Sequence, residues 1–209
     1  MGNRKMLGEM PMRVMLDQSP AKIAEYTEKF QYEFWQFRTP LTRYKIAPVP
    51  WGLDNGCFTH FHRKEWEAML IEAKKNMPVF VTLPDVWGDA RRTMELFHAF
   101  FWKTEHLPRA LVLQDGVAEL EIPWKNLSGV FLGGSDAFRI LPSTTNILKA
   151  AKILGKWIHI GRLNSPDQIK NWCEIANSLD GSGLSRFDDT LDKMMKALKN
   201  ENRQPNLDL

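Results

Sequence analysis

Several apolar runs of this sequence are followed at once by residues that can carry charge or form hydrogen bonds. These segments are GLDNGCF with Asp54, TLPDVWGD with Asp85, LVLQDG with Gln114 and Asp115, FLGGSD with Gly133 and Gly134, IHIGRLNS with His159, Arg162 and Asn164, and SLDGSG with Asp180. Each segment alone is typical of a turn, because Asp, Asn and Gly favour turns. Six of them in succession indicate instead that these residues meet in one site.

Asp85, Gln114 and the main chain at Gly133 and Gly134 offer acceptors and donors suited to a flat heterocycle. A carboxylate accepts two N–H bonds, while an amide side chain and a backbone N–H can hold a carbonyl oxygen. Guanine presents the matching pattern through N1–H, its exocyclic amine and O6. Glycine has no Cβ to keep a ligand away from the main chain. Because most of the segments carry acids, we expect a neutral base here rather than a deeply bound phosphate.

Asp54 and Asp180 then remain free for chemistry. Asp180 ends a short apolar run and precedes a loop of two glycines and two serines, which would let a ligand approach. In the exchange of an N-glycosidic bond, one carboxylate attacks or stabilises the developing sugar cation while a second moves protons. The residues therefore predict a site for a purine nucleoside. A plain Asp-Gly turn is the alternative for Asp180.

The elements that would position these residues follow from an alternation of short apolar runs with stretches of helical periodicity. The expected strands are Met12–Leu16, Lys45–Val49, Val79–Leu83, Ala110–Leu113, Gly129–Leu132, Trp157–Ile160 and Ser178–Asp180. The expected helices span about Pro20–Phe37, Arg63–Asn76, Asp89–Thr104, Thr144–Leu154, Pro166–Ala176 and Asp188–Lys199. Ser19 is the expected N-cap of the first helix and Ser165 that of the fifth.

This alternation predicts parallel strands joined by crossover helices. We expect an α/β fold, a compact TIM-like (β/α)8 barrel in which one unit can be degenerate, because the strands are short and evenly spread and no Gly-x-Gly-x-x-Gly segment follows the first. An open doubly wound sheet is the alternative. In both folds ligands bind at the carboxyl ends of the strands, where the residues above are found.

The composition indicates one globular catalytic domain at residues 1–200, followed by a polar tail at 201–209. The net charge of +3 gives no strong electrostatic argument for nucleic acid. No apolar run reaches the roughly 20 residues of a membrane span, and the N-terminus lacks the apolar stretch of a signal peptide. We therefore expect no membrane partner. The presence of only two cysteines, Cys57 and Cys173, agrees with a reducing cytoplasm, and we expect a cytoplasmic protein.

In their order along the chain, these motifs resemble those of the tRNA-guanine transglycosylase superfamily, over about residues 53–186. LDNGCF resembles that family's Asp-Ser-Gly-Gly-Phe segment, LPDV lies where it has a base-reading acid, LQDG resembles its Gln-Gly segment, FLGGS its Gly-Gly-Leu segment, IHIGRLNSPDQI its Met-Gly-Val-Gly-x-Pro-x-Asp stretch, and DGSGLSR its Asp-Cys-Val-Leu-Pro-Thr-Arg segment. The resemblance implies that Asp180 is the nucleophile and that Asp54 transfers protons and positions the substrate. It also implies that the base contacts Asp85, Gln114, Gly133, Gly134 and Ile160.

The sequence departs from the family's tRNA enzymes in its length and in its zinc ligands. Cys57 and Cys173 cannot form the family's Cys-x-Cys-x-x-Cys plus His site, so neither zinc nor any other cofactor is expected. In its short length and its lack of zinc ligands, the sequence resembles the DNA-acting branch of the superfamily, which is found in phages and bacterial defence islands. In that branch guanine in DNA is replaced by a 7-deazaguanine such as 7-cyano-7-deazaguanine.

The expected partners are therefore guanine-containing DNA and a 7-deazaguanine co-substrate, in the host cytoplasm if the gene belongs to a phage. The sequence leaves open whether the protein acts alone or whether a second copy of the chain, or a partner subunit, supplies further nucleic-acid-binding parts. Arg162, Asn164 and Arg186 lie close to Asp180 in the sequence and are the candidates for contacts with backbone phosphates.

Four other functions fit the same residues. The protein could exchange bases in tRNA, or it could be an N-glycoside hydrolase in which water resolves the intermediate. It could bind guanine or a deazaguanine nucleotide without catalysis. It could also be a TIM-barrel enzyme of unrelated chemistry, because a fold alone does not determine a reaction.

Overall fold

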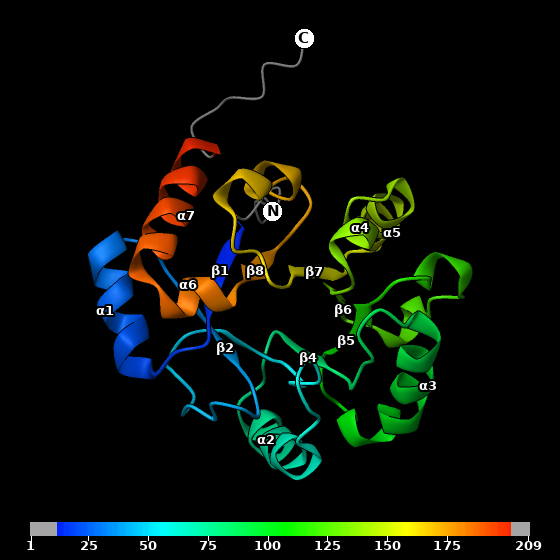
Figure 1. Ribbon diagram of the computed structural model, residues 1–209. Helices are drawn as coiled ribbons and strands as arrows, with labels where there is room; N and C mark the ends of the chain where they lie inside the picture. Colours follow the sequence, from blue (N-terminus) through cyan, green and yellow to red (C-terminus); the bar gives the residue numbers. More distant parts are fainter. Residues whose placement is uncertain (1–11, 202–209) are drawn as a thin grey trace, which may run out of the picture.

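The computed structural model describes residues 12–201, and its strands lie at the centre with helices around them (Figure 1). The strands are β1 (Arg13–Leu16), β2 (Trp35–Arg38), β3 (Trp51–Leu53), β4 (Phe80–Thr82), β5 (Arg109–Leu113), β6 (Gly129–Leu132), β7 (Trp157–Ile160) and β8 (Ser178–Asp180). The α-helices are α1 (Pro20–Phe30), α2 (Arg63–Lys75), α3 (Ala90–Phe100), α4 (Asp136–Arg139), α5 (Pro142–Ile153), α6 (Ser182–Arg186) and α7 (Asp188–Glu201). Four 3-10 helices are η1 (Phe101–Thr104), η2 (Val117–Glu119), η3 (Trp124–Asn126) and η4 (Pro166–Asn171). Residues 202–209 of the expected tail lie outside the described residues.

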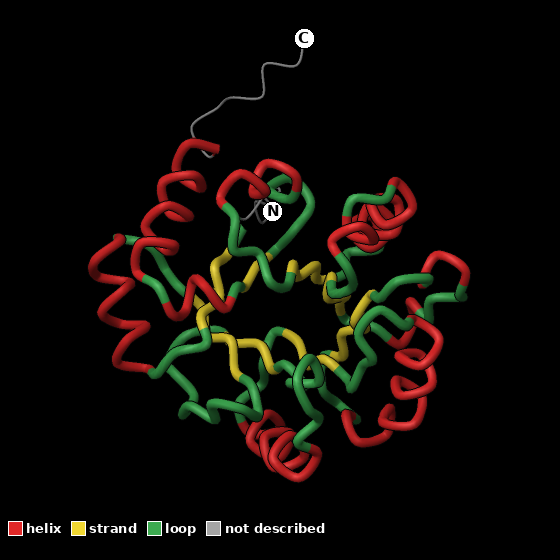
Figure 2. The backbone as a smooth tube through the Cα atoms, in the orientation of Figure 1, coloured by secondary structure: helices red, strands yellow, loops and turns green. Residues whose placement is uncertain are grey.

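All eight strands are parallel and form a closed barrel in the order β1 to β8. The barrel closes between its first and last strands, where Arg13 pairs with Ser178 and Met15 with Asp180. Figure 2 looks into the barrel, with the strands forming an inner ring and the helices lying around it. The expected compact (β/α)8 barrel is confirmed, and the open sheet is excluded.

Two of the eight strands lie where the sequence analysis placed other structure. The expected strand Lys45–Val49 is wrong, since these residues form a loop in the structure. Pro48 within this run and Pro50 after it have no backbone N–H to give to a sheet, so the apolar pattern could not become a strand. After β2, the chain returns to the barrel only at β3.

The first helix is shorter than expected, and residues after its end form a strand. Ser19 caps α1 as expected, accepting a hydrogen bond from the backbone N–H of Lys22. The helix ends at Phe30 because Gln31 adopts a left-handed conformation with φ of 51°. Trp35–Arg38, which the sequence analysis placed at or beyond the end of this helix, form β2.

The β2–β3 unit is degenerate, because a loop replaces its helix, and only the 3-10 helices η2 and η3 lie between β5 and β6. The buried amide of Gln36 holds this loop: its Nε2 donates to the carbonyl of Lys45 and its Oε1 accepts from the N–H of Ala47, both at 2.8 Å. In the seventh unit, the expected helix Pro166–Ala176 is instead the short 3-10 helix η4, and Ser165 makes no side-chain capping bond.

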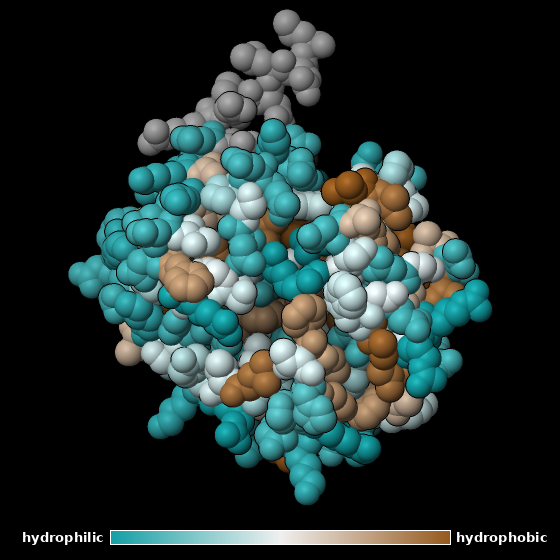
Figure 3. All heavy atoms as spheres, in the orientation of Figure 1, coloured by the Kyte–Doolittle hydropathy of each residue, from teal (hydrophilic) through white to brown (hydrophobic). Residues whose placement is uncertain are grey.

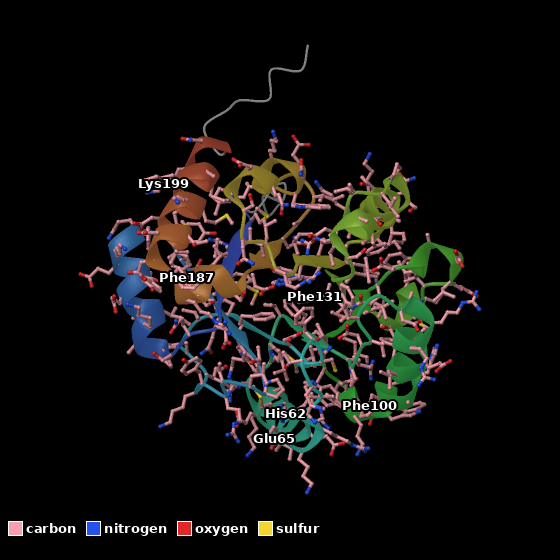
Figure 4. All side chains as sticks on the ribbon, in the orientation of Figure 1. His62, Glu65, Phe100, Phe131, Phe187 and Lys199 are labelled. Atoms are coloured by element: carbon pink, nitrogen blue, oxygen red, sulfur yellow. The ribbon has the colours of Figure 1, made fainter. Side chains whose placement is uncertain are left out.

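The inward-facing side chains of the strands fill the barrel with a mainly aromatic core. Its members are Met15, Trp35, Phe37, Phe80, Ala110, Val112 and Phe131. Figure 4 shows Phe131 near the middle of the ring of strands, whereas His62 and Glu65 lie at the outer edge with α2. The apolar residues on the opposite faces of the strands pack with the helices in separate clusters. The packed core closes the barrel, so a ligand can approach only at its ends.

Candidate active site

A cavity lies at the carboxyl ends of the strands and gathers most of the residues that the sequence analysis singled out. It is lined by Phe37, Asp54, Asn55, Phe58, Asp85, Trp87, Val112, Gln114, Phe131, Gly133, Gly134, Arg162 and Asp180. In the space-filling view, apolar and polar residues meet in a hollow near the middle of the face (Figure 3). The carboxyl groups of Asp54, Asp85 and Asp180 therefore converge at one mouth of the barrel.

The two-residue period of the strands places these side chains on the rim. Successive side chains along a strand point to opposite faces. Gln114 follows the inward-facing Val112 by two residues, and Asp180 follows Ser178 in the same way. Each polar residue thus extends the inward-facing row of its strand to the point where the barrel opens.

Asp180 is held through only one of its carboxylate oxygens. Its Oδ1 lies 3.0 Å from His159 Nε2 and accepts a hydrogen bond from the backbone N–H of Arg162 at 3.3 Å. Its Oδ2 has no hydrogen-bond partner among the described residues, and 14% of the side chain is exposed. A carboxylate fixed at one oxygen and open at the other is suited to attack an electrophilic carbon.

A chain of hydrogen bonds through the barrel interior orients the imidazole that holds Asp180. Trp157 Nε1 can only donate, and it donates to Ser178 Oγ at 2.9 Å. The Ser178 hydroxyl can then donate to His159 Nδ1 at 2.8 Å, which leaves the imidazole proton on Nε2, facing Asp180. The His159 ring is fully buried and stacks on Phe37 with a centroid distance of 5.4 Å. His159 is therefore a rigid donor to Asp180.

Asp54 is a carboxyl group poised to exchange a proton near neutral pH. Its Oδ2 accepts from the backbone N–H of Gly56 at 3.0 Å, and its Oδ1 accepts from the Thr82 hydroxyl at 3.2 Å. Burial raises the pKa of Asp54 to about 7, and the negative charges of Asp85 and Asp180 act in the same direction. A group with this pKa can act as an acid and as a base at neutral pH.

Asp85 and Gln114 form a polar wall of the same cavity and are joined by a hydrogen bond. Gln114 Nε2 donates to Asp85 Oδ2 at 2.5 Å, and Asn55 Nδ2 donates to Asp85 Oδ1 at 2.9 Å. Burial raises the pKa of Asp85, although these two bonds favour its charged form. Each carboxylate oxygen has two lone pairs, so Asp85 retains the capacity to accept N–H groups of a ligand.

The two glycines line the cavity, but their N–H groups are engaged within the protein. The N–H of Gly133 donates to the carbonyl of Leu113 at 3.1 Å, and that of Gly134 donates to Gln114 Oε1 at 3.0 Å. A Cβ at Gly133 would lie 2.9 Å from Gln114 Nε2 and from Val112 Cγ1. The expected contact of an amide near Gly133 or Gly134 with a base carbonyl stays a prediction, and it requires one of these bonds to be exchanged. Glycine at 133 is required by the packing of Gln114.

Ile160 was expected at the face of the base, and this placement is wrong. Ile160 is fully buried in the cluster between the barrel and the helices and does not line the cavity. The cause is again the period of the strand, since Ile160 follows the inward-facing His159 by one residue. The aromatic residues Phe37 and Phe131 line the cavity instead.

Of the three candidates for phosphate contacts, only Arg162 lines the cavity. It has a positive φ of 56°, which is uncommon for a residue with a side chain, and its guanidinium Nη2 donates to the carbonyl of Gly134. Asn164 is exposed and its Oδ1 accepts from the N–H of Gly183 at 2.7 Å, so it anchors the start of α6, which follows Asp180. Arg186 is exposed at the end of α6.

The sequence analysis did not identify the aromatic rim of the cavity. Phe58 and Trp87 are 65% and 55% exposed, and their rings meet edge to face with centroids 6.5 Å apart. The guanidinium carbon of Arg162 lies 5.2 Å from the Phe58 ring centroid. Both aromatic residues stand within four positions of a candidate acid, but a sequence does not show which of eight tryptophans is exposed.

A fourth carboxyl group, Asp17, also stands at this end of the barrel. It directly follows β1, and its Oδ1 accepts from the Thr42 hydroxyl at 2.6 Å. Burial raises the pKa of Asp17 to about 6, and the charge of Asp180 also raises it. The rule that polar residues end each apolar run could have identified Asp17, since it follows the first expected strand.

Within residues 12–201, no group of three His, Cys, Asp or Glu side chains is arranged to hold a metal ion. The expectation of a protein without zinc or another cofactor stays a prediction. No helix among the same residues is long and apolar enough to cross a membrane.

Comparisons with known proteins extend the description of the fold. No protein-family model matches the sequence, and no curated protein matches it either. The structure is similar to that of phosphoribosylanthranilate isomerase from Thermotoga maritima, at 12% identity and a TM-score of 0.53, over 90% of this chain and 99% of that one. An HpcH/HpaI aldolase from Desulfitobacterium hafniense DCB-2 matches over 95% of each chain, at 9% identity and a TM-score of 0.48. At such identities the likeness to the isomerase shows the barrel fold alone, so the resemblance to transglycosylases stays a prediction.

Proposed function

We propose that this protein is an enzyme that exchanges guanine in DNA for a 7-deazaguanine base, such as 7-cyano-7-deazaguanine. The observation that carries this proposal is the meeting of Asp54, Asp85, Gln114 and Asp180 in one cavity walled by aromatic rings. One carboxylate with an open oxygen, one carboxyl group that titrates near neutral pH and one polar wall for a base edge are the parts that exchange at a glycosidic carbon requires.

In the first half of the reaction, the free Oδ2 of Asp180 attacks C1′ of the target guanosine. The C1′–N9 bond breaks, its electron pair leaves with guanine, and Asp54 gives a proton to the departing base. His159 and the N–H of Arg162 keep Oδ1 in place, so Oδ2 approaches the sugar in a fixed orientation. The product is a covalent Asp180–glycosyl intermediate.

In the second half, the incoming deazaguanine reverses these steps. Asp54 takes the N9 proton of the new base, N9 attacks C1′, and the bond from C1′ to Asp180 breaks. The pKa of about 7 allows Asp54 to serve in both directions at neutral pH. No net proton is lost or gained, and the energy of one glycosidic bond replaces that of the other.

The polar wall supports recognition of the guanine edge. Asp85 accepts from N1–H and the exocyclic amine, while Gln114 rotates its amide to serve O6 and frees the N–H of Gly134 for the same oxygen. The cavity now measures about 100 Å³, below the 300 to 1,000 Å³ usual for ligand sites. Base entry therefore requires the side chains that line the cavity to rearrange, and the exposed rings of Phe58 and Trp87 are then placed to stack on the base. The target nucleoside itself must first leave the DNA stack.

The test is incorporation of labelled 7-cyano-7-deazaguanine into single-stranded and duplex DNA, with tRNA in parallel. We expect label in DNA, release of an equal amount of guanine and an adduct that survives denaturing electrophoresis. Asp180→Asn should abolish incorporation, whereas Asp167→Asn, at an exposed acid in η4, should not.

Other results would redirect or end the proposal. Label in tRNA but not in DNA would assign the tRNA reaction, and guanine release without uptake of label would assign hydrolysis. Full activity of Asp180→Asn would remove the nucleophile and with it the mechanism.

A further inference from the structure

A second cavity of about 290 Å³ lies beside the candidate active site. Its lining includes Asp136 and Arg139 of α4, and Arg162, Gln168 and Asn171 of the segment that follows β7. Arg162 lines both cavities and is therefore part of the wall between them. Whatever occupies the second cavity lies next to a nucleoside bound in the first.

The second cavity holds a buried guanidinium group whose hydrogen bonds are incomplete. Arg139 is 6% exposed, and its Nη1 donates to the carbonyl of Gly161 at 2.6 Å. Its Nη2 is shielded from solvent and has no hydrogen-bond partner among the described residues, so the guanidinium group must turn toward the cavity before a ligand can bond to this nitrogen. Leaving a buried charged donor unpaired is costly, so a group of this kind usually has a partner that completes it.

The charges around Arg139 indicate what that partner is. Among residues 12–201, neither Arg139 nor Arg162 forms an ion pair with a carboxylate. Burial lowers the pKa of Arg139 and the positive charge of Arg162 lowers it further, whereas the negative charges of Asp136 and Asp180 raise it, so the neighbouring carboxylates compensate the two cations only in part. The acid on this wall, Asp136, is exposed and is not within ion-pairing distance of either guanidinium.

We infer that this cavity is a phosphate-binding subsite in which Arg139 and Arg162 hold a phosphodiester group next to the flipped nucleoside. Paired guanidinium groups offer forked N–H donors that match the geometry of phosphate oxygens. Gln168 and Asn171 add exposed amide donors at the rim. The inference rests on the proposed function for the identity of the ligand, because the phosphodiester belongs to the polynucleotide that the first cavity modifies.

The subsite can be tested by binding, without any turnover. The first probe is inorganic phosphate, followed through the Nε–H NMR signal of Arg139, which is assigned by its loss in Arg139→Lys. The second probe is a set of single-stranded oligodeoxynucleotides with one guanosine, in which single phosphates are replaced by neutral methylphosphonates. Gln168→Glu places a carboxylate on the exposed wall of the cavity without altering the buried arginine. Arg92→Gln, at an exposed arginine of α3, is the matched control.

We expect inorganic phosphate to shift the Arg139 signal in the wild type and in Arg92→Gln but not in Gln168→Glu. One methylphosphonate beside the guanosine should weaken wild-type binding about tenfold, since it removes a charge-assisted contact. The same replacement should cost nothing further in Gln168→Glu.

Equal losses at every phosphate position in both proteins would overturn the inference. The inference would also be overturned if phosphate shifted the Arg139 signal but the methylphosphonate beside the guanosine weakened binding by the same factor in the wild type and in Gln168→Glu. The cavity would then take free phosphate rather than a polynucleotide. If the position-specific loss is found but base exchange is absent, the subsite stands and the proposed function fails.

Discussion

Replacing Asp54 by Asn should stabilise the protein at high pH, because this carboxyl group is charged there at a cost to the fold. Burial raises its pKa from 3.8 to about 7. A raised carboxyl pKa means that the folded state holds its proton more tightly than the unfolded chain. The associated stability is present in full below pH 3.8 and is lost as the pH rises through 7.

The size of the effect follows from the two pKa values. A difference of about 3 pKa units corresponds to roughly 4 kcal/mol over the whole range. About 2.5 kcal/mol of this falls between pH 5 and pH 8, when both protonation equilibria are included. Asn can keep the geometry of the protonated acid, since its oxygen accepts from the N–H of Gly56 and its amide donates to the Thr82 hydroxyl.

The assay is urea unfolding followed by tryptophan fluorescence, at pH 5 and at pH 8. Between these values the wild type should lose about 2.5 kcal/mol more of its unfolding free energy than Asp54→Asn does. If both proteins changed equally, within about 0.5 kcal/mol, the burial argument for Asp54 would be refuted.

Asp115 provides a control of opposite sign. Burial disfavours its charge, but hydrogen bonds from the hydroxyl and the N–H of Ser135 outweigh burial and lower its pKa. A lowered pKa gives stability that is present above pH 3.8 and lost as the pH falls through the folded-state pKa. Asp115→Asn should therefore destabilise the protein at pH 8, where Asp54→Asn stabilises it.

Three further predictions concern the hydrogen bonds, packing and rim of the cavity. His159→Phe should keep the fold, since the ring lies among Phe37 and other aromatic residues. It should lower kcat for base exchange about tenfold to a hundredfold with little change in KM, because a hydrogen bond to a charged group contributes about 1.5–3 kcal/mol. An unchanged kcat would exclude a positioning role for His159. Gly133→Ala should lower the unfolding free energy by about 1–3 kcal/mol in urea titrations, because the new Cβ overlaps Gln114, and an unchanged midpoint would contradict this. Trp87→Ala should raise KM for the base about tenfold through loss of stacking, whereas Trp102→Ala, at a 75% exposed tryptophan of η1, should not; equal effects would remove the rim from base binding.

The sequence by itself was sufficient for the fold class and for most of the cavity. Short apolar runs separated by helical periodicity specify parallel strands, and in such folds the carboxyl ends of the strands meet at one edge. Asp85, Gln114 and Asp180 could therefore be grouped without coordinates, because each follows a run that the pattern assigns to the barrel. Asp54 was grouped with them although the strand expected before it, Lys45–Val49, is a loop and the true strand is β3. The period of two also contained the information that Ile160 points outward, next to the inward-facing His159.

Tertiary structure decided the features that depend on distant residues. β2 could not be separated from α1 by local pattern, because a strand buried on both faces has no alternation of its own. The anchoring of Asp180 by His159, which Ser178 orients, needs two neighbouring strands in register. The raised pKa of Asp54 depends on burial and on charges that only folding brings near. Local periodicity determines which elements form, whereas packing between them determines which polar groups lose water, and that loss of water sets their charge.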